Sequence, residues 1–263
     1  MSQVGNRGVT MGDGIEPWSK WLVPRVRHRV WVVRARLATI CPPSLRPAAR
    51  KLASHLPKPD RAEVFRGIYR GGGWGKGLDT VSGLGSTLDQ TAAVRRELPV
   101  VLKDVGARSI LDAPCGDFFW MKECDLGCID YIGMDLVPEI VAENAKRFAA
   151  DGHRFIVGDI VNDDLPRVDA ILCRDCLVHL PFADALAALR NFKRSGSEYL
   201  LTTTFTDRTS NSDVSTVGDW RPLNLERGPF SLPAPLRLVN ECCPVAGYSD
   251  KSLGLWLLSS IPD

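Results

Sequence analysis

The sequence predicts an α/β fold built on a mostly parallel sheet of seven strands with an antiparallel hairpin at one edge. From Arg108 to Phe205, five short apolar runs alternate with segments of helical character, which is the pattern of βαβ units. After Phe205 the alternation stops, and two more apolar runs follow a long polar, proline-rich loop. The length of 263 residues is ample for one such domain with a single core.

The individual elements follow from composition and periodicity. The five alternating runs predict strands over residues 109–113, 131–136, 154–160, 168–176 and 198–205. Helices are expected over 88–105, 138–152 and 181–196, and residues 118–125 are also compatible with a helix. The last two runs, at 235–243 and 252–260, predict the edge hairpin, with its final strand beside the fifth strand. Residues 57–91 are rich in glycine and aromatic residues, which we interpret as too glycine-rich for a helix.

The charge distribution divides the chain into an extension over residues 1–56 and a main domain over residues 57–263. The extension holds ten Lys and Arg against two acidic residues, whereas the main domain is mildly acidic and thus a poor nucleic-acid partner. Residues 1–16 resemble a flexible tail, and residues 17–40 repeat apolar residues at helical spacing among arginines. Such a basic amphipathic helix suits contact with an anionic membrane or docking on the chain's own domain, and we favour docking.

Neither a membrane span nor a signal peptide is visible in the sequence. No run approaches the roughly 18 apolar residues of a span, so we expect a cytoplasmic protein, with peripheral contact at the inner membrane surface as the alternative that residues 17–40 allow. The eight cysteines are then expected to be reduced thiols. Cys173 and Cys176 form a C-x-x-C pair, but Cys173 lies in an apolar run, which favours buried thiols over zinc. We therefore predict no metal site.

The turn after the first predicted strand is the natural place for a cofactor, because ligands bind at the carboxyl ends of parallel strands. It reads Ala113 to Asp117, and of the glycines in a dinucleotide-binding G-x-G-x-x-G only Gly116 is present. Pro114 and Phe118 stand where glycines would help a phosphate approach the backbone. This favours a cofactor without phosphates, such as S-adenosylmethionine, and disfavours a nicotinamide dehydrogenase.

Three acidic residues end the first three predicted strands at nearly regular intervals. They are Asp112, Asp135 and Asp159, separated by 23 and 24 positions. An acid at the second strand end accepts hydrogen bonds from ribose hydroxyls, and one at the third can accept from an adenine amine. Aspartate is common in such loops, but the set of three is informative.

The run ILDAPCGDFFWM…YIGMDL…FIVGDI…VDAILCRDCLVHLP resembles a class I S-adenosylmethionine-dependent methyltransferase with a Rossmann-like sheet, over roughly residues 85–263. The resemblance implies that the first loop holds the methionine moiety, Asp135 the ribose and Asp159 the adenine. The cofactor-binding residues expected from it are Asp112, Cys115, Gly116, Asp117, Asp135, Leu136, Asp159, Ile160, Arg174, Trp74 and Ser86. The sequence departs from the family's D/E-x-G-x-G-x-G loop at Pro114 and Phe118.

The motif LDAPCGD, preceded by IY…WG…SG-x-GST, also resembles a bacterial subgroup of small-molecule or sugar methyltransferases. This narrower resemblance implies that the glycine-rich segment forms a lid over the cofactor. The lid residues would be Tyr69, Trp74, Gly75, Ser82, Gly85 and Ser86. The alternative is a surface loop whose Trp74 only packs on the body of the domain.

The fourth strand ends in polar residues that would lie beside the methyl donor. His179 has a near-neutral intrinsic pKa and is the candidate general base, with Asp175 orienting it or holding the acceptor hydroxyl. Arg174 would instead anchor an acidic group or pair with Asp175. The alternative for His179 is packing against the sheet without a catalytic role.

The loop over residues 206–233 is the second candidate wall of the acceptor site. Its many polar side chains favour a small polar acceptor such as a sugar or a glycolipid headgroup. The expected acceptor-binding residues are Asp207, Arg208, Trp220 and Arg221. The predicted activity is O-methyl transfer, and the alternatives are N-methyl transfer to an amine or a protein, or cofactor binding without catalysis.

Overall fold

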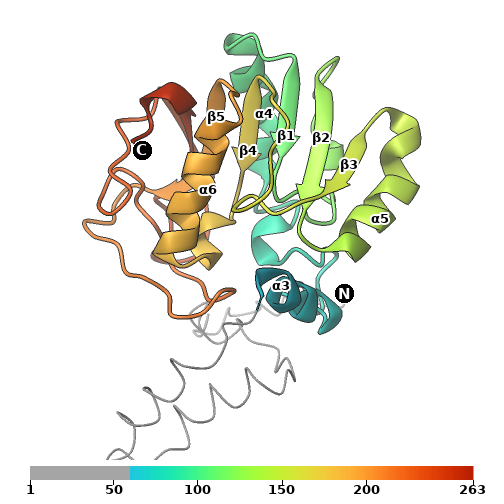
Figure 1. Cartoon of the computed structure of the whole chain (residues 1–263), viewed down its shortest axis with the longest axis horizontal. Coiled ribbons are helices and arrows are strands. Elements are labelled where there is room, and N and C mark those ends of the chain that lie inside the picture. The colour runs from blue at the N-terminus through green and yellow to red at the C-terminus, as the bar shows by residue number, and fades with distance from the viewer. Residues whose placement is uncertain (1–59, 263) are drawn as a thin grey trace, which may run out of the picture.

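A computed structural model describes residues 60–262, so the extension predicted over residues 1–56 and its membrane contact lie outside the described residues. The described part contains one seven-stranded sheet in the order β3-β2-β1-β4-β5-β7-β6 (Figure 1). The strands are β1 Ser109–Asp112, β2 Asp130–Asp135, β3 Arg154–Val157, β4 Ala170–Cys173, β5 Tyr199–Phe205, β6 Arg237–Asn240 and β7 Lys251–Leu257. β1 to β5 are parallel, and β7 runs antiparallel between β5 and β6. The predicted fold is confirmed, including the edge hairpin with its last strand beside the fifth.

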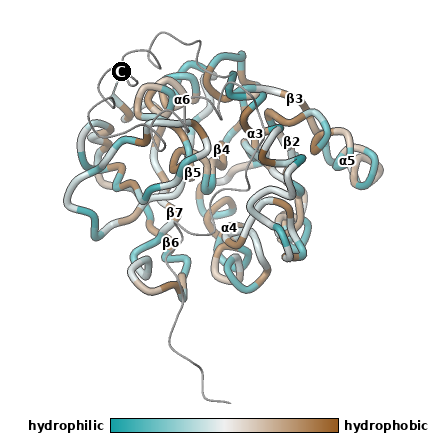
Figure 2. The backbone as a smooth tube through the Cα atoms, turned by 90° about the horizontal axis from the view of Figure 1, so that it is seen from below, coloured by the Kyte–Doolittle hydropathy of each residue, from teal (hydrophilic) through white to brown (hydrophobic). Residues whose placement is uncertain are grey.

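Helices cover both faces of this sheet. They are α3 Arg61–Arg70, α4 Ala92–Asp104, α5 Pro138–Phe148 and α6 Phe182–Arg194. α4 and α6 lie on opposite sides of the strands, as the view from below shows (Figure 2). Successive strand residues point to opposite faces, so Ile171 of β4 joins the core beneath α6 and Leu172 joins the core beneath α4. This two-sided burial explains why β4 is apolar throughout.

The sequence of α6 shows why a helix forms there and which face it buries. Ala185, Leu189 and Phe192 repeat at helical spacing and are buried against the sheet. Asp184 lies in the first turn and Lys193 and Arg194 lie in the last turn, which complements the helix dipole. None of the helices within residues 60–262 is long and apolar enough to cross a membrane.

Two sequence expectations are wrong. Residues 57–91 do contain a helix, α3, because its segment RAEVFRGIYR has only one glycine and the glycine cluster begins just after it, at Gly71. Residues 118–125 form only a single 3₁₀ turn at Met121–Glu123. Gly116 and Phe118 both adopt positive φ angles, 53° and 57°, and this turns the chain back so that Phe118 packs into the core instead of starting a helix.

The sheet topology brings distant parts of the chain to the edge formed by the carboxyl ends of the parallel strands, which is not the lateral edge where the β6–β7 hairpin lies. β1 to β5 all end at this carboxyl edge, and antiparallel β7 begins there. α3 lies below this edge in Figure 1, and its Arg61 contacts Asp159, which follows β3. Any site at this edge is therefore built from the strand ends and covered by the segment that precedes α4.

Asn191 of α6 fixes the loop that carries Asp159 and Ile160. Its buried amide nitrogen donates to the carbonyl oxygens of Ile160 at 2.9 Å and of Asp163 at 2.8 Å. Asn191→Leu leaves both carbonyls without this donor, so we expect the free energy of unfolding to fall by about 2–4 kcal/mol in urea titrations. Arg190→Gln, on the exposed side of the same helix, is the matched control. A loss no larger than that of the control would contradict this role.

Candidate functional site

A cavity of about 620 Å³ runs along the edge where the parallel strands end, within the usual size range of ligand pockets of about 300–1,000 Å³. We call the part lined by the ends of β1, β2 and β3 the β1–β3 half, and the part lined by the ends of β4 and β5 and by the β6–β7 connection the β4–β7 half. The cavity brings together these predicted residues: Trp74, Ser86, Asp112, Cys115, Gly116, Asp135, Leu136, Asp159, Ile160, Arg174, Asp175, His179 and Trp220. Asp117, Asp207, Arg208 and Arg221 do not line it.

Two buried carboxyl groups form the floor of the β1–β3 half. Asp112 accepts a hydrogen bond of 2.7 Å from the Tyr131 hydroxyl, and burial raises its pKa to about 7. Asp135 accepts hydrogen bonds from the backbone N–H groups of Gly116, at 3.1 Å, and Val137, at 2.9 Å. Burial nevertheless raises the pKa of Asp135 to about 6. A ligand that donates hydrogen bonds or carries positive charge would therefore stabilise the ionised form of both carboxyl groups.

The first loop admits only glycine at position 116. Gly116 has a positive φ of 53°, and a Cβ atom there would lie 2.3 Å from Ser82 Oγ. The absence of a side chain lets the glycine-rich segment above the loop come within contact distance of it. The remaining glycine of the family loop is therefore the one that the local geometry requires.

Asp159, the third acid, joins the cavity to α3. Its Oδ1 atom accepts from the N–H of Val161 at 2.9 Å, and its Oδ2 atom accepts from the Arg61 guanidinium at 2.7 Å. Arg61 also pairs with Asp184 of α6 at 3.1 Å. An arginine with two carboxylate partners thus fixes the start of α3 at the entrance to the β1–β3 half.

The glycine-rich segment after α3 covers the cavity, and Asp117 anchors it. The Asp117 carboxylate accepts from the hydroxyls of Thr80, at 3.0 Å, and Ser82, at 2.8 Å, and from the N–H of Val81 at 2.9 Å. Asp117 therefore binds the covering segment, whereas the sequence placed it among the cofactor residues. Trp74 of this segment lines the cavity, and its ring lies 4.8 Å from the ring of His179.

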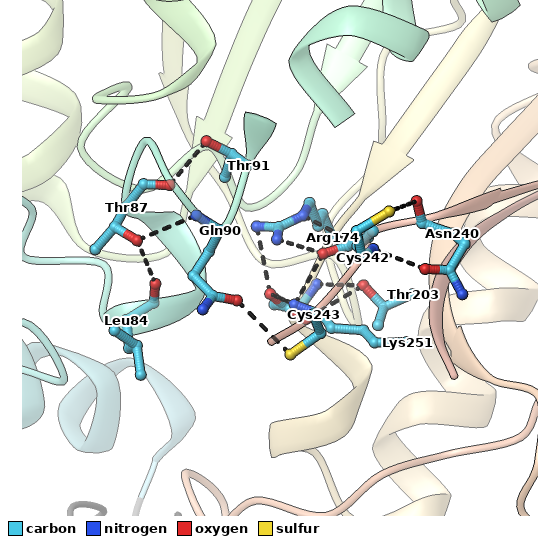
Figure 3. A network of polar contacts seen from close by, with 12 residues as sticks. Leu84, Thr87, Gln90, Thr91, Arg174, Thr203, Asn240, Cys242, Cys243 and Lys251 are labelled. Atoms are coloured by element: carbon cyan, nitrogen blue, oxygen red, sulfur yellow. Dashed lines mark hydrogen bonds and ion pairs between the residues drawn. The ribbon is translucent and has the colours of Figure 1, made fainter. Parts of the chain in front are cut away.

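Four charged side chains form a compact network, and three of them, Arg174, Asp175 and Lys251, line the β4–β7 half. Figure 3 labels Arg174 and Lys251 of this network. Arg174 donates two hydrogen bonds to Glu241, of 3.1 and 2.6 Å, and lies 3.3 Å from Asp175. Lys251 Nζ lies 2.6 Å from Asp175 Oδ2 and 3.0 Å from Glu241 Oε2. Burial raises the pKa of Asp175, but Lys251 and Arg174 outweigh it and hold that pKa at about 2. Asp175 is thus ionised at neutral pH and poorly suited to act as a general base.

The backbone of Asp175 is also constrained. Its φ is 52°, a left-handed conformation that aspartate tolerates better than most residues. Its N–H donates to Thr203 Oγ1 at 2.8 Å, which holds this turn on β5. The carboxylate is therefore fixed both through its backbone and through its ion pairs.

His179 ends the short 3₁₀ turn after β4 and lines the β4–β7 half. Its Nδ1 atom lies 3.2 Å from the carbonyl oxygen of Asp219, which can only accept, so Nδ1 carries the proton. In the neutral ring Nε2 is then the proton acceptor. Burial lowers the pKa of His179 to about 4, and the Asp175 carboxylate opposes this only in part. His179 and Asp175 line the same cavity, as the sequence predicted, and His179 is neutral at pH 7.

The polar side chains of the loop after β5 mostly hold the loop itself. Arg221 is buried and donates to the carbonyl oxygens of Leu177 and Leu180, and Arg208 pairs with Asp250 at 2.9 Å. Asp207 is exposed at the start of the loop. Trp220 is the one member of the four predicted acceptor residues that lines the cavity.

Sequence reasoning missed Arg61, Glu241 and Lys251. The sequence held a signal for Lys251, because a lysine directly precedes the apolar run of the last strand. In the structure its side chain is only 8% exposed. Glu241 and Arg61 gave no such signal, since their partners lie 67 and 98 positions away in the sequence. Among residues 60–262, no three His, Cys, Asp or Glu side chains are grouped as a metal site requires.

Asp117→Asn tests the anchoring of the cover. The amide replaces one acceptor oxygen by a donor that faces other donors, so we expect the segment to loosen and trypsin to cleave faster after the exposed Lys76. Affinity for S-adenosylhomocysteine should fall by about tenfold in calorimetry, the equivalent of 1.4 kcal/mol. Asp125→Asn, in an exposed turn, is the control. Unchanged cleavage and affinity would show that the cover does not depend on Asp117.

The protonation state of His179 can be read directly. Since its pKa is lowered in the folded protein, the neutral ring is favoured, and its NMR resonances should stay those of neutral imidazole down to about pH 5. The resonance that disappears in the His179→Asn variant is the one that belongs to His179. A titration midpoint near 6.5, the value of a free histidine, would refute the neutral ring.

Comparisons with known proteins agree with this geometry. A family described as a methyltransferase domain matches residues 110–196. Human N-acetylserotonin methyltransferase in complex with S-adenosylmethionine is similar in fold, with a TM-score of 0.52 and 15% identity over 86% of this chain and 66% of that one. No curated protein matches the chain in sequence.

Two further solved structures are more distant. Magnesium protoporphyrin IX methyltransferase from Synechocystis with bound S-adenosylhomocysteine has a TM-score of 0.38 and 16% identity, covering 46% of this chain and 60% of that one. The methyltransferase domain of bacterial CtHen1 has a TM-score of 0.39 and 18% identity, covering 45% and 66%. The chain thus spans at most about two thirds of these solved proteins. Residues 110–196 thus match a methyltransferase domain in sequence, and the fold of the described residues is similar to that of the human enzyme.

Proposed function

We propose that the protein is an S-adenosylmethionine-dependent methyltransferase that methylates a hydroxyl oxygen of a small acceptor. The observation that carries the oxygen assignment is His179, a neutral imidazole that lines the cavity in the β4–β7 half. Its Nδ1 atom is held by the carbonyl of Asp219, so Nε2 can take a proton. Methylation of a neutral hydroxyl needs such a base, whereas methylation of a neutral amine does not.

The β1–β3 half suits the cofactor by its own chemistry. Each carboxylate has about four acceptor positions, so Asp135 and Asp159 keep capacity for further donors such as ribose hydroxyls and an adenine amine. Gly116 leaves room for close approach to the backbone. The cofactor supplies a methyl group on a positively charged sulfur, which favours a surrounding of carboxyl groups such as Asp112.

In the β4–β7 half, this chain's residues would orient the acceptor and remove its proton. Asp175 stays ionised and can accept a hydrogen bond from the acceptor without taking its proton. His179 then receives the proton as the oxygen attacks the methyl group. The cover formed by Trp74 and its neighbours keeps water from this reaction.

The sugar or glycolipid acceptor expected from the sequence stays a prediction. A lipid-linked acceptor would give the basic residues 17–40 a role at a membrane surface, and this also stays a prediction because those residues lie outside the described range. N-methyl transfer and cofactor binding without catalysis are the outcomes that would replace the proposal.

His179→Ala and Asp175→Asn test the proposed roles. We expect kcat to fall by about 10²- to 10⁴-fold for His179→Ala, because a general base contributes on this scale. The dissociation constant of S-adenosylhomocysteine should stay within about twofold in both variants, since neither residue lies in the β1–β3 half. Production of S-adenosylhomocysteine with sugars, phenols and amines as acceptors is the activity measurement.

His153→Ala is the matched control, because His153 packs against Phe118 and Tyr131 away from the cavity lining. Wild-type turnover in His179→Ala would eliminate the general base. Tight cofactor binding without turnover on any acceptor would favour the non-catalytic alternative.

A further inference from the structure

The β4–β7 half offers few polar groups to an acceptor. Arg208 and Arg221 of the loop after β5 bind Asp250 and backbone carbonyls, and Asn211 and Asn224 bind carbonyl groups of the same loop. The guanidinium of Arg174 is taken up by Glu241. Several polar side chains of the loop that the sequence predicted as a polar wall therefore hold the loop together or bind it to neighbouring segments.

The cavity wall beside this loop is aromatic, and three segments contribute to it: Trp220 comes from the loop, Phe205 from the end of β5 and Tyr248 from the β6–β7 connection. Trp220, Phe205 and Tyr248 all line the cavity and pack edge to face, with ring centroids 5.1 Å apart for Trp220 and Tyr248 and 5.9 Å for each of them with Phe205. Aromatic rings pair favourably when they meet edge to face or offset, beyond the gain from buried area alone. An acceptor with a planar apolar body therefore suits this wall.

The polar end of this half consists of Asp175, Lys251 and His179. Lys251 has three N–H donors, and two of them are directed at Asp175 and Glu241. Lys251 also lines the cavity, so we assign its third donor to an acceptor oxygen. A Cβ atom on Gly85 would lie 2.8 Å from Asp175 Oδ2, so the covering segment closes directly over this pair.

We propose, building on the methyl transfer proposed above, that the acceptor is a hydroxylated aromatic ring, with its ring against Trp220 and Tyr248 and its oxygen between His179 and Lys251. The acceptor's O–H proton passes to His179, an O–CH₃ bond forms, and the S–CH₃ bond breaks with its electron pair remaining on sulfur. Lys251 stabilises the negative charge that develops on the acceptor oxygen.

Two arguments favour this acceptor over a sugar. Each sugar hydroxyl that leaves water needs a hydrogen-bond partner, and this half supplies partners for one polar end only. The second argument concerns acidity. A phenolic hydroxyl has a pKa near 10 and an aliphatic hydroxyl is a much weaker acid, so the weakly basic His179 is better matched to the phenol.

A panel of acceptors tests the class of substrate. Purified protein with S-adenosylmethionine would be assayed for S-adenosylhomocysteine with phenol, catechol and 2-naphthol, with methyl glucoside, and with benzylamine. We expect turnover of the phenols with kcat/KM at least tenfold above that of the glucoside. Turnover of the glucoside without the phenols would overturn the aromatic acceptor and leave O-methyl transfer intact. Turnover of benzylamine alone, or of nothing while the cofactor binds, would overturn the proposed function itself.

Variants separate recognition from folding. Trp220→Leu should raise KM for 2-naphthol at least tenfold without changing the affinity for S-adenosylhomocysteine, and Phe119→Leu, outside the cavity lining, should change neither. Lys251→Met should lower kcat more for phenol than for the more acidic 4-nitrophenol, and Lys251→Arg should restore most of it. Equal losses on both phenols, or an unchanged KM in Trp220→Leu, would refute this placement of the acceptor.

Discussion

The buried guanidinium of Arg174 holds the edge of the molecule on which the site is built. It extends from the end of β4 to Glu241, just after β6, and Lys251 at the start of β7 completes the contact. Its side chain is only 4% exposed and lies over the Trp120 ring. Loss of one partner from such a buried pair typically costs about 3–5 kcal/mol, because an uncompensated charge remains. Buried ion pairs thus join the end of β4 to the β6–β7 hairpin, and each charge depends on its partner for compensation.

The cavity cover depends on a second set of contacts, in which carboxylates near the strand ends hold a distant segment of the chain. Asp117 follows the first loop directly, and it holds the covering segment by three donors from residues 80–82. Arg61 holds the preceding helix by Asp159, which follows β3. The loops expected to contact the cofactor are therefore also the loops that position its cover. A change in either loop affects both the floor and the roof of the β1–β3 half.

The sequence predicted the parts of this structure that depend on local pattern. Apolar runs gave the seven strands, and the acids at strand ends gave Asp112, Asp135 and Asp159, which all line one cavity. It could not show that Arg208 and Asp250 pair across 42 positions, so the polar loop was interpreted as a substrate wall. The sequence also did not reveal α3, because the glycine cluster that begins at Gly71 makes residues 57–91 as a whole rich in glycine, although the helical segment itself has only one. Long-range pairing and the reversal of the chain at Phe118 depend on tertiary packing that no local window contains.

The reversed direction of β7 has a consequence for how such a protein can diverge. Because β7 begins at the edge where its neighbours end, one short connection of the chain, residues 241–251, delivers Tyr248 and Lys251 to the β4–β7 half. Nothing in that connection contributes to the β1–β3 half. Substitutions or insertions there, or in the loop after β5, would change the β4–β7 half and leave the residues at the ends of β1, β2 and β3 unchanged. The two halves of the cavity are in this sense built by separate parts of the chain.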